Sequence, residues 1–308
     1  MAAYEAQLRA DAQLDRVEDA RRAQRALERQ LDVYREQFPP IEKPVAEMQR
    51  IDAGAAVLAA QQEAAARISR LRFGRRRAAR EAAAVTARAQ ADIDQQEAIR
   101  AQAQRQAEID MVWQRLVDND PEVVLQALEE AFEDNEVSAA PIDCEGSSVF
   151  VLLRCPVLDG MVPTHRPVET PSGSGRVRAY AKTRRNELYL AALLGHGYAT
   201  VAETFAIAPG ISDVTLLTVS VGAGELTPVY CAHVTRDEFR GGGWLHDGAP
   251  CLAPRHLVNL LGRTAEVWAL DLAAEPQLSD VVRRIAKDLG VTVSERTNLA
   301  APSGPAVS

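Results

Sequence analysis

The chain has 308 residues, room for about two domains, and a net charge of −8 from 35 basic and 43 acidic residues. This charge argues against a nucleic-acid binder that is basic over its whole surface. Residues 1–118 hold 20 basic and 19 acidic residues, a net charge of +1, whereas residues 119–308 hold 15 and 24, a net charge of −9. Any contact with phosphate therefore has to come from a local basic cluster.

Residues 4–38 have the pattern of an amphipathic helix. Apolar residues recur at steps of three and four, and Arg, Glu and Asp fill the flanks, which is typical of a coiled coil. A helix of this length is about 52 Å long. The residues of this heptad seam are Val17, Ala20, Gln24, Leu27, Leu31, Tyr34 and Phe38.

A Pro-rich turn at residues 39–44 ends this helix, and a second helix is predicted over residues 45–118. Gly74 lies within it, and we favour a straight or mildly kinked helix over a reversal at that point. The turn favours an antiparallel hairpin in which residue 8 opposes residue 74. Because large apolar residues are widely spaced along the second helix, it needs a partner, and we expect residues 1–118 to drive self-association.

An arginine cluster lies inside the second predicted helix. The segment "RISRLRFGRRRAAR", residues 67–80, contains seven arginines, which a continuous helix would spread around most of its circumference. A solvated helix surface is the favoured interpretation, and the alternatives are contact with nucleic acid or with the acidic C-terminal half. The candidate phosphate contacts here are Arg75, Arg76, Arg77 and Arg80.

Residues 119–297 are predicted to form a compact mixed α/β domain, so that the chain as a whole belongs to the α+β class. Asp120 and Pro121 suit the N-cap and first turn of a helix. Residues 298–308 are predicted to be a disordered tail. Further helices are expected at 179–194, 254–262 and 278–290, and strands at 147–155, 211–221, 226–234, 265–273 and 291–295.

A second basic run follows a long Pro/Gly/Ser-rich loop, residues 156–176, at the start of a predicted helix. Backbone donors at a helix start favour anions, and Tyr180 adds a surface for stacking. By context this is the better phosphate candidate, although a junction kept soluble by its charge is the simpler interpretation. Its residues are Arg176, Arg178, Lys182, Arg184 and Arg185.

Five cysteines and histidines within 26 residues are weak candidates for a metal site: Cys231, His233, His246, Cys251 and His256. Zinc prefers tetrahedral sets of thiolate and imidazole. The spacings match no familiar finger or ribbon, so ordinary packing is the favoured interpretation. We predict neither a metal nor a cofactor.

The motifs of several enzyme classes are missing from the sequence. It contains no GK[ST] phosphate loop, no GxGxxG fingerprint at a strand–helix turn and no GxSxG nucleophile elbow. Asp143 and Glu145 precede a predicted strand, as acids do in nuclease-like folds, but no acid-x-Lys pair follows. A nuclease-like domain, if present, would be degenerate or atypical, and an enzyme is disfavoured.

The first residues, "MAAYEAQLRADAQ", are charged and lack the apolar core of a signal peptide. The longest uncharged apolar run, residues 188–202, is too short for a membrane span. We therefore expect a cytoplasmic protein with reduced cysteines and no membrane contact. The sequence favours a non-enzymatic coiled-coil interaction or scaffold protein whose α/β domain binds a partner. The alternative is a nucleic-acid-associated protein that binds phosphate through its arginine clusters.

Overall fold

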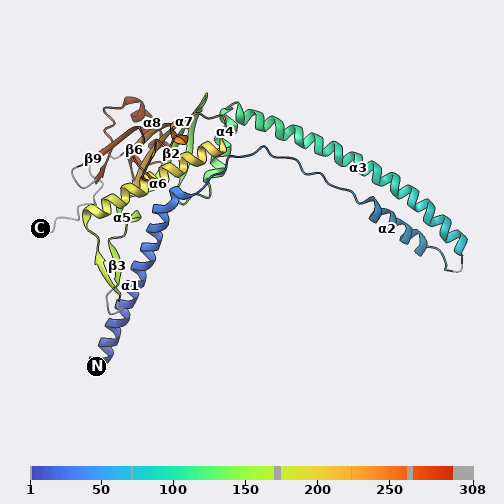
Figure 1. Cartoon of the computed structure of the whole chain (residues 1–308), viewed down its shortest axis with the longest axis horizontal. Coiled ribbons are helices and arrows are strands. Elements are labelled where there is room, and N and C mark those ends of the chain that lie inside the picture. Colours follow the sequence, from blue (N-terminus) through green and yellow to red (C-terminus); the bar gives the residue numbers. More distant parts are fainter. Residues whose placement is uncertain (1, 71, 170–174, 223, 262–265, 294–308) are drawn as a thin grey trace. The chain divides into compact units, whose positions relative to one another are not determined.

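A computed structural model describes residues 2–70, 72–169, 175–222, 224–261 and 266–293 (Figure 1). The chain forms two compact units: residues 1–41 with 116–308, termed the α/β unit, and residues 42–115, termed the helical unit. The predicted α+β class is confirmed. The division differs from the predicted boundary at residue 118, because the first helix packs within the α/β unit. The predicted tail at 298–308 lies outside the described residues.

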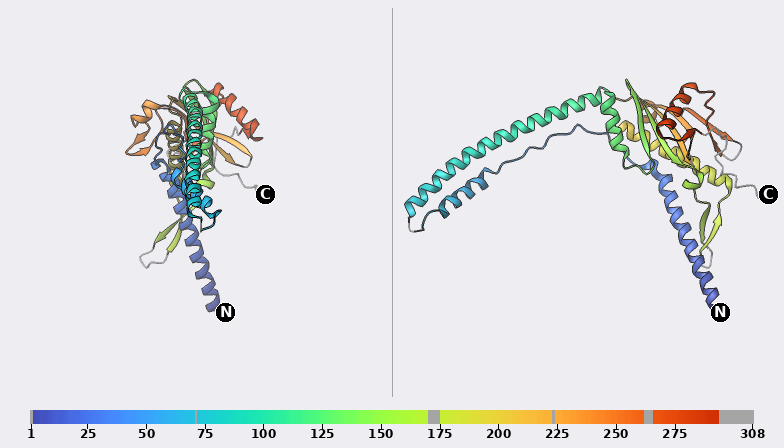
Figure 2. Two further views of the ribbon diagram at one scale, coloured as in Figure 1. Left: turned by 90° about the vertical axis from the view of Figure 1, so that its right-hand side faces the viewer. Right: turned by 180° about the vertical axis from the view of Figure 1, so that it is seen from behind.

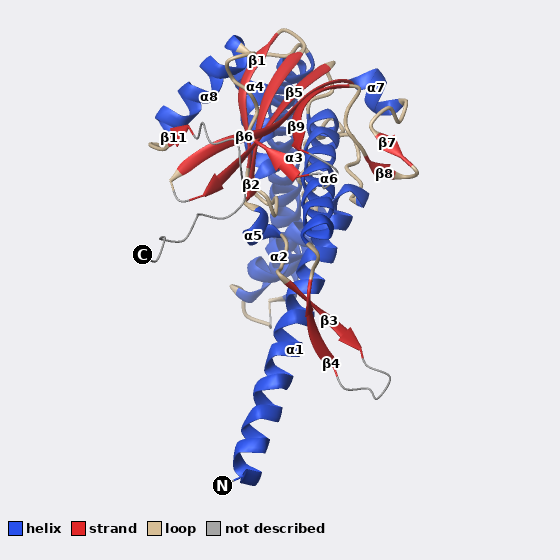
Figure 3. Ribbon diagram, turned by 90° about the vertical axis from the view of Figure 1, so that its left-hand side faces the viewer, coloured by secondary structure: helices blue, strands red, loops and turns tan. Residues whose placement is uncertain are grey.

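A mixed sheet forms the centre of the α/β unit (Figure 3). Its strands lie in the order β1-β2-β5-β6-β9-β10, and a short β11 pairs with β6. β2 runs parallel to β5 and β11 parallel to β6, whereas the other neighbours are antiparallel. The bounds are β1 Ala139–Glu145, β2 Ser148–Pro156, β5 Asp213–Gly222, β6 Glu225–Thr235, β9 Arg255–Leu261, β10 Glu266–Trp268 and β11 Thr292–Val293.

Two helices cover the opposite faces of this sheet. α6 (Lys182–Ile207) connects the parallel strands β2 and β5, and a Cβ at its Gly197 would lie 3.0 Å from Leu216 of β5. The next residue, Leu217, packs on the other side with Val282 of α8 (Pro276–Asp288), as the alternation of side chains along a strand requires. α6 is long and apolar enough by composition to cross a membrane, but 72% of its apolar window is buried inside the protein.

One arginine side chain caps the C-terminal end of α6. Arg236, at the start of α7 (Arg236–Arg240), donates from its guanidinium to the carbonyls of Phe205, Ala208 and Ile211 at 2.7–2.8 Å. Its guanidinium carbon also lies 4.6 Å from the centre of the Phe205 ring. The last carbonyls of a helix have no partner within the helix, so this cation satisfies them and interacts favourably with the helix dipole.

Most of the remaining predicted elements of the α/β unit are present. Asp120 caps α4 (Pro121–Phe132) by accepting from the amide of Glu122 at 3.2 Å. The predicted helix at 254–262 is wrong, because this segment pairs with β6 as β9. A short apolar run of that kind does not distinguish a helix from a strand. Other short elements are α5 (Leu158–Met161), β7 (Leu245–His246) and β8 (Ala249–Pro250).

The first helix, α1 (Ala2–Asp32), ends six residues before the predicted 38, and a 3₁₀ turn η1 (Val33–Arg35) follows it. The helical conformation therefore ends before Pro39, and residues 36–41 form neither helix nor strand. The seam residues Val17, Ala20 and Leu27 are buried within the α/β unit, where α1 packs against α6 and a β-hairpin. The predicted hairpin between the first and second helices is therefore wrong, because the seam is covered by the α/β unit instead.

The helical unit contains α2 (Ala53–Ala66) and most of α3 (Phe73–Val117), which run in opposite directions (Figure 2). The predicted helix start at 45 is wrong, because residues 42–52 form neither helix nor strand. Glutamines of α3 hold this segment instead: Gln106 accepts from the amide of Ala46 at 2.8 Å, and Gln95 accepts from that of Ile51 at 3.2 Å. The predicted straight or mildly kinked helix is also wrong, because α2 ends at Ala66 and α3 begins at Phe73 with the opposite direction. Gly74 lies in the first turn of α3.

Candidate functional site

A two-stranded β-ribbon projects from the α/β unit between α5 and α6 (Figure 3). Its strands, β3 (His165–Glu169) and β4 (Gly175–Ala179), are antiparallel and pair only with each other. Residues 170–174 between them lie outside the described residues. The segment was predicted as a loop, but "HRPVE" and "RVRA" flank a Pro/Gly/Ser turn and alternate in polarity, which is the signal of a hairpin.

The ribbon has two chemically different faces, because successive side chains point to opposite sides of a strand. His165, Pro167 and Val177 alternate with Arg166, Arg176 and Arg178 along the two strands. The first set lies on the same side of the ribbon as Gly175, where the ribbon approaches α1 closely: a Cβ at Gly175 would lie 2.6 Å from Val17 Cγ1. The second set is exposed and is termed the arginine face.

The arginine face brings like charges together. Arg166 and Arg178 are direct cross-strand partners, and Arg176 lies two residues further along the same side of β4. Among the described residues, no acidic side chain forms an ion pair with any of the three. Like charges directly opposite each other destabilise a strand pair. The ribbon therefore holds positive charge that an anionic ligand would neutralise.

A depression of about 560 Å³ adjoins this face at the base of the ribbon. It is lined by Arg166, Arg178, Ala179, Tyr180, Ala181 and Arg184. The guanidinium carbon of Arg166 lies 5.9 Å from the centre of the Tyr180 ring, and the Tyr180 hydroxyl donates to Gln24 of α1 at 2.5 Å. Tyr180 thereby fixes the base of the arginine face to α1.

The other basic residues predicted for this site have partners. Arg185 is half-buried and donates to Asp159 and to the carbonyl of Val162, both at 2.7 Å. Lys182 pairs with Glu266 at 3.0 Å, and Arg184 pairs with Glu187 at 3.0 Å on the exposed side of α6. The predicted basic residues therefore do not form one site. Arg176 and Arg178 belong to the arginine face together with Arg166, which the sequence did not predict, whereas Arg185 has a structural role.

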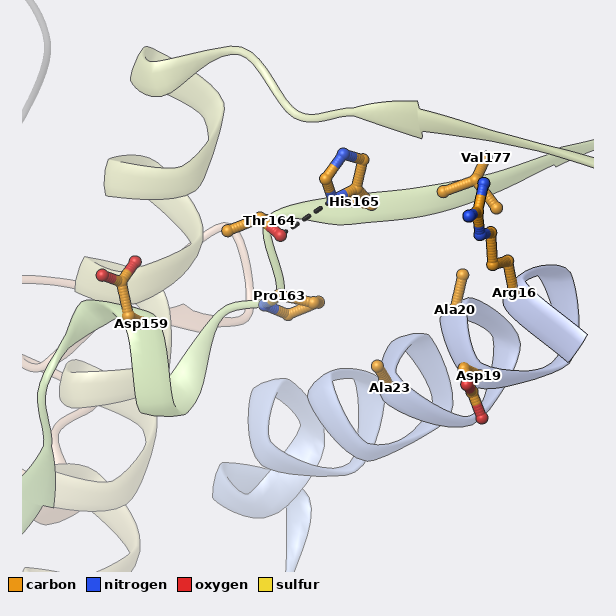
Figure 4. Close-up of a pocket in the computed structure, with 9 residues that line it drawn as sticks. All are labelled: Arg16, Asp19, Ala20, Ala23, Asp159, Pro163, Thr164, His165 and Val177. Carbon is orange, nitrogen blue, oxygen red and sulfur yellow. Dashed lines mark hydrogen bonds between the residues drawn. The ribbon is translucent and has the colours of Figure 1, made fainter. Parts of the chain in front are cut away.

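A groove of about 720 Å³ runs along the other side of the ribbon, between β3 and α1 (Figure 4). Arg16 and Ala20 point from α1 toward the ribbon, and Asp19 points away from it. The Thr164 hydroxyl lies 2.8 Å from His165 Nδ1. The lining contains the basic Arg16 and the acidic Asp19 and Asp159. The groove is therefore not uniformly positive, unlike the arginine face. Its lining is Arg16, Asp19, Ala20, Ala23, Asp159, Pro163, Thr164, His165 and Val177.

The arginines predicted on the second helix lie in the first two turns of α3, within the helical unit. Arg77 pairs with Glu81 at 3.0 Å, in an exposed i,i+4 contact. Positive charge at a helix N-terminus is unfavourable toward the helix dipole. The structure gives Arg75, Arg76, Arg77 and Arg80 no shared concave surface among the described pockets.

The five cysteine and histidine candidates do not converge. Cys231 packs beside the α8 cluster, and burial raises the pKa of its thiol to about 11, which disfavours the thiolate that zinc requires. His233 contacts Thr215 and Asp213, His246 is exposed beside Asp247, and His256 stacks on Tyr230. Cys251 contacts the carbonyl of Leu252. Within the described part of the chain, no three His, Cys, Asp or Glu side chains are placed to hold a metal.

One buried histidine has no counterpart in the predicted sites. His196 of α6 is only 4% exposed, and its Nε2 atom has no partner. Burial lowers its pKa to about 4, so the imidazole is neutral at physiological pH. It lines a cavity of about 70 Å³ with Val33 and Thr200. This space is too small for a substrate, and we assign His196 a place in the core.

Comparison of the chain with protein-family models, with curated proteins and with solved structures finds no match in any of the three.

Proposed function

We propose that this protein is a non-enzymatic interaction protein whose α/β unit binds nucleic acid through the arginine face of the β3–β4 ribbon. The observation that carries the proposal is the direct cross-strand placement of Arg166 and Arg178, without acidic partners, beside Arg176. Residues 164–185 hold six basic residues and one acid, a net charge of +5 in a chain of −8. This concentration of charge supports a local grip on a polyanion.

The chemistry of the arginine face suits phosphate. A guanidinium group presents a planar fork of donors that binds phosphate oxygens in pairs, and it stays charged at any physiological pH. Contacts of this kind position a protein on nucleic acid without reading its sequence. We therefore expect binding that depends strongly on salt and weakly on base sequence.

The ribbon is also held firmly enough to present these side chains together. An isolated two-stranded hairpin is at best marginally stable in water. Here α1 supports the ribbon through the contact of Val17 with Gly175 and through Gln24 with Tyr180, and Arg21 lies 4.0 Å from Glu169. All three contacts involve the first helix, which the sequence assigned to a coiled coil.

The same proposal includes a scaffold role in the cytoplasm. All four cysteines, Cys144, Cys155, Cys231 and Cys251, are free thiols, which is the usual state in a reducing compartment. The helical unit would then connect copies of the chain, while each α/β unit contributes one arginine face.

The test is a titration of fluorescently labelled duplex DNA, single-stranded DNA and duplex RNA at several salt concentrations. With about four phosphate contacts, the slope of log K against log salt is expected near −3.5 for duplex DNA. Replacing Arg166, Arg176 and Arg178 together by Ala should reduce the slope by about 3.

A matched control removes the same charge from another part of the chain. The triple change of Arg75, Arg76 and Arg77 to Ala also deletes three arginines, and it should leave the slope and the affinity nearly unchanged. Absence of binding to all three nucleic acids at low salt would refute the proposed function. Equal losses in the two triple variants would show that net charge, rather than the arginine face, controls binding.

A further inference from the structure

In the helical unit, small apolar side chains are buried and large ones are exposed, which is the reverse of the usual pattern. Its buried apolar side chains, among the described residues, are all alanine: Ala46, Ala65, Ala84 and Ala91. Its other described large apolar side chains are no more than half-buried. Nine of them are exposed: Val45, Met48, Leu58, Phe73, Val85, Ile93, Ile99, Met111 and Val112. Alanine burial removes little apolar area from water. A unit built in this way needs a further surface to cover it.

One side of α3 is already covered within the helical unit. Ala84 and Ala91 are buried, and Gln95, Gln102 and Gln106 on the same side bond to residues 46–51 or pack near them. At 100° per residue, the opposite side of the helix presents a second row of residues. This outward stripe is exposed throughout and consists of Ala78, Ala82, Val85, Ala89, Ile93, Gln96, Arg100, Ala103, Ala107 and Met111.

The outward stripe contains large apolar side chains as well as small ones. Val85 is 68% exposed, Ile93 52% and Met111 60%. The members Ala78, Ala89, Arg100 and Met111 recur every eleven residues, a period of 3.67 per turn that keeps a stripe on one side of a nearly straight helix. Over its 33-residue length the stripe therefore offers a continuous seam of about 50 Å.

We propose that the outward stripe binds the same stripe of a second copy of this chain, with the two α3 helices antiparallel. The charges along α3 support this occupant. Residues 73–91 hold five arginines and one acid, a net charge of +4, and residues 92–110 hold five acids and two arginines, a net charge of −3. An antiparallel pair places the basic half of each helix beside the acidic half of the other. A parallel pair would place like charges side by side.

The stripe is also self-complementary in size. If residue n lies opposite residue 185 − n, Ala78 meets Ala107 and Ala82 meets Ala103, so alanine faces alanine on both sides of the centre. Val85 then lies beside Ile99 and Arg100 of the other copy, and Ile93 lies close to the two-fold axis. A two-fold interface requires this reciprocity, in which each contact occurs twice. Paired alanines allow the helix axes to approach closely.

Cysteine cross-linking in the full-length chain tests both the pairing and its direction. In the antiparallel register, residue 82 of one copy lies near residue 103 of the other, whereas the two copies of residue 82 are about 32 Å apart. A disulfide requires Cα atoms within about 7 Å. The double variant Ala82→Cys/Ala103→Cys should therefore form a disulfide-linked dimer under mild oxidation, and neither single variant should do so.

The wild-type chain, with its four native cysteines, gives the background for this experiment. Linkage of each single variant to itself would refute the antiparallel direction. Failure of the double variant to link, together with a monomeric mass by sedimentation, would overturn the proposal altogether. A disulfide to a different segment, identified by peptide mapping, would show that another surface covers the stripe and would overturn it equally.

A matched pair of charge substitutions gives a second readout. Ala89→Glu places a carboxylate in the outward stripe, and Ala101→Glu places one at an exposed position of the same helix outside it. The first change should raise the dimer dissociation constant by about tenfold or more, because it removes a charge from water and puts a long side chain where the seam holds alanine. The second should leave the constant nearly unchanged, and equal effects of the two would contradict the placement of the seam. Neither experiment requires nucleic acid, so the dimer and the arginine face can fail independently.

Discussion

Replacement of Arg236 by Ala is expected to destabilise the α/β unit strongly, although this residue lies far from the arginine face in sequence. Its guanidinium donates to three carbonyls, those of Phe205, Ala208 and Ile211, at 2.7–2.8 Å. Each hydrogen bond from a charged donor contributes about 1.5 kcal/mol or more when buried and less when partly solvated. Because Arg236 is half-buried, we expect Arg236→Ala to lower the free energy of unfolding by about 3 kcal/mol.

Urea unfolding followed by tryptophan fluorescence measures this loss. Trp113 lies in the helical unit, so a Trp113→Phe background leaves Trp244 and Trp268 to report on the α/β unit. With an m value of about 3 kcal/mol/M, the midpoint should fall by about 1 M urea. Arg240→Ala, an exposed change in the same short helix, should shift the midpoint by less than about 0.2 M. Equal shifts for the two variants would refute the assignment of Arg236 as the cap of α6.

Two further predictions concern the ribbon and the core. Gly175→Ala should cost about 1–3 kcal/mol, because the added Cβ would lie 2.6 Å from Val17 Cγ1. The double variant Gly175→Ala/Val17→Ala should recover part of this loss in urea unfolding, and strict additivity would contradict the contact. Burial lowers the pKa of His196 in the folded state to about 4, from the ordinary 6.5. Between pH 4 and pH 6.5 the imidazole is therefore protonated in the unfolded state but not in the folded state. The free energy of unfolding of the wild-type chain should therefore fall by about 3 kcal/mol as the pH drops from 6.5 to 4. His196→Leu should remove this part of the pH dependence. Parallel plots of unfolding free energy against pH for the two chains would rule out this role of His196.

Much of the α/β unit could be predicted from local patterns because these patterns leave few alternatives. The buried run of β2, the β5–β6 hairpin and the helix after Asp120 each combine apolar character with a turn or cap residue. The segment 254–262 could not be assigned in this way. Its apolar residues fit a short helix as well as a strand, and only pairing with β6 decides between them.

The candidate site could be predicted in part, since Arg176 and Arg178 were recognised as a basic cluster beside a loop. Arg166 lies outside this predicted cluster, because it precedes Pro167 in a Pro/Gly/Ser-rich segment whose composition is typical of a loop. The sequence also could not separate Arg185 from the others, because the pairing with Asp159 joins residues 26 positions apart. Which arginines are free to bind a ligand depends on where the acids lie in space, and spacing along the chain does not determine that.

The two helical regions show why a heptad seam predicts burial but not the partner. The seam of α1 was assigned to a coiled coil, yet Val17, Ala20 and Leu27 are covered by the α/β unit. The close packing of the ribbon on Val17 depends on Gly175, a residue more than 150 positions away that offers no local signal. The second predicted helix has more widely spaced large apolar residues, and α3 leaves three of them, Val85, Ile93 and Met111, exposed. Self-association is thus better proposed for the outward stripe of α3 than for α1, which already has its partner.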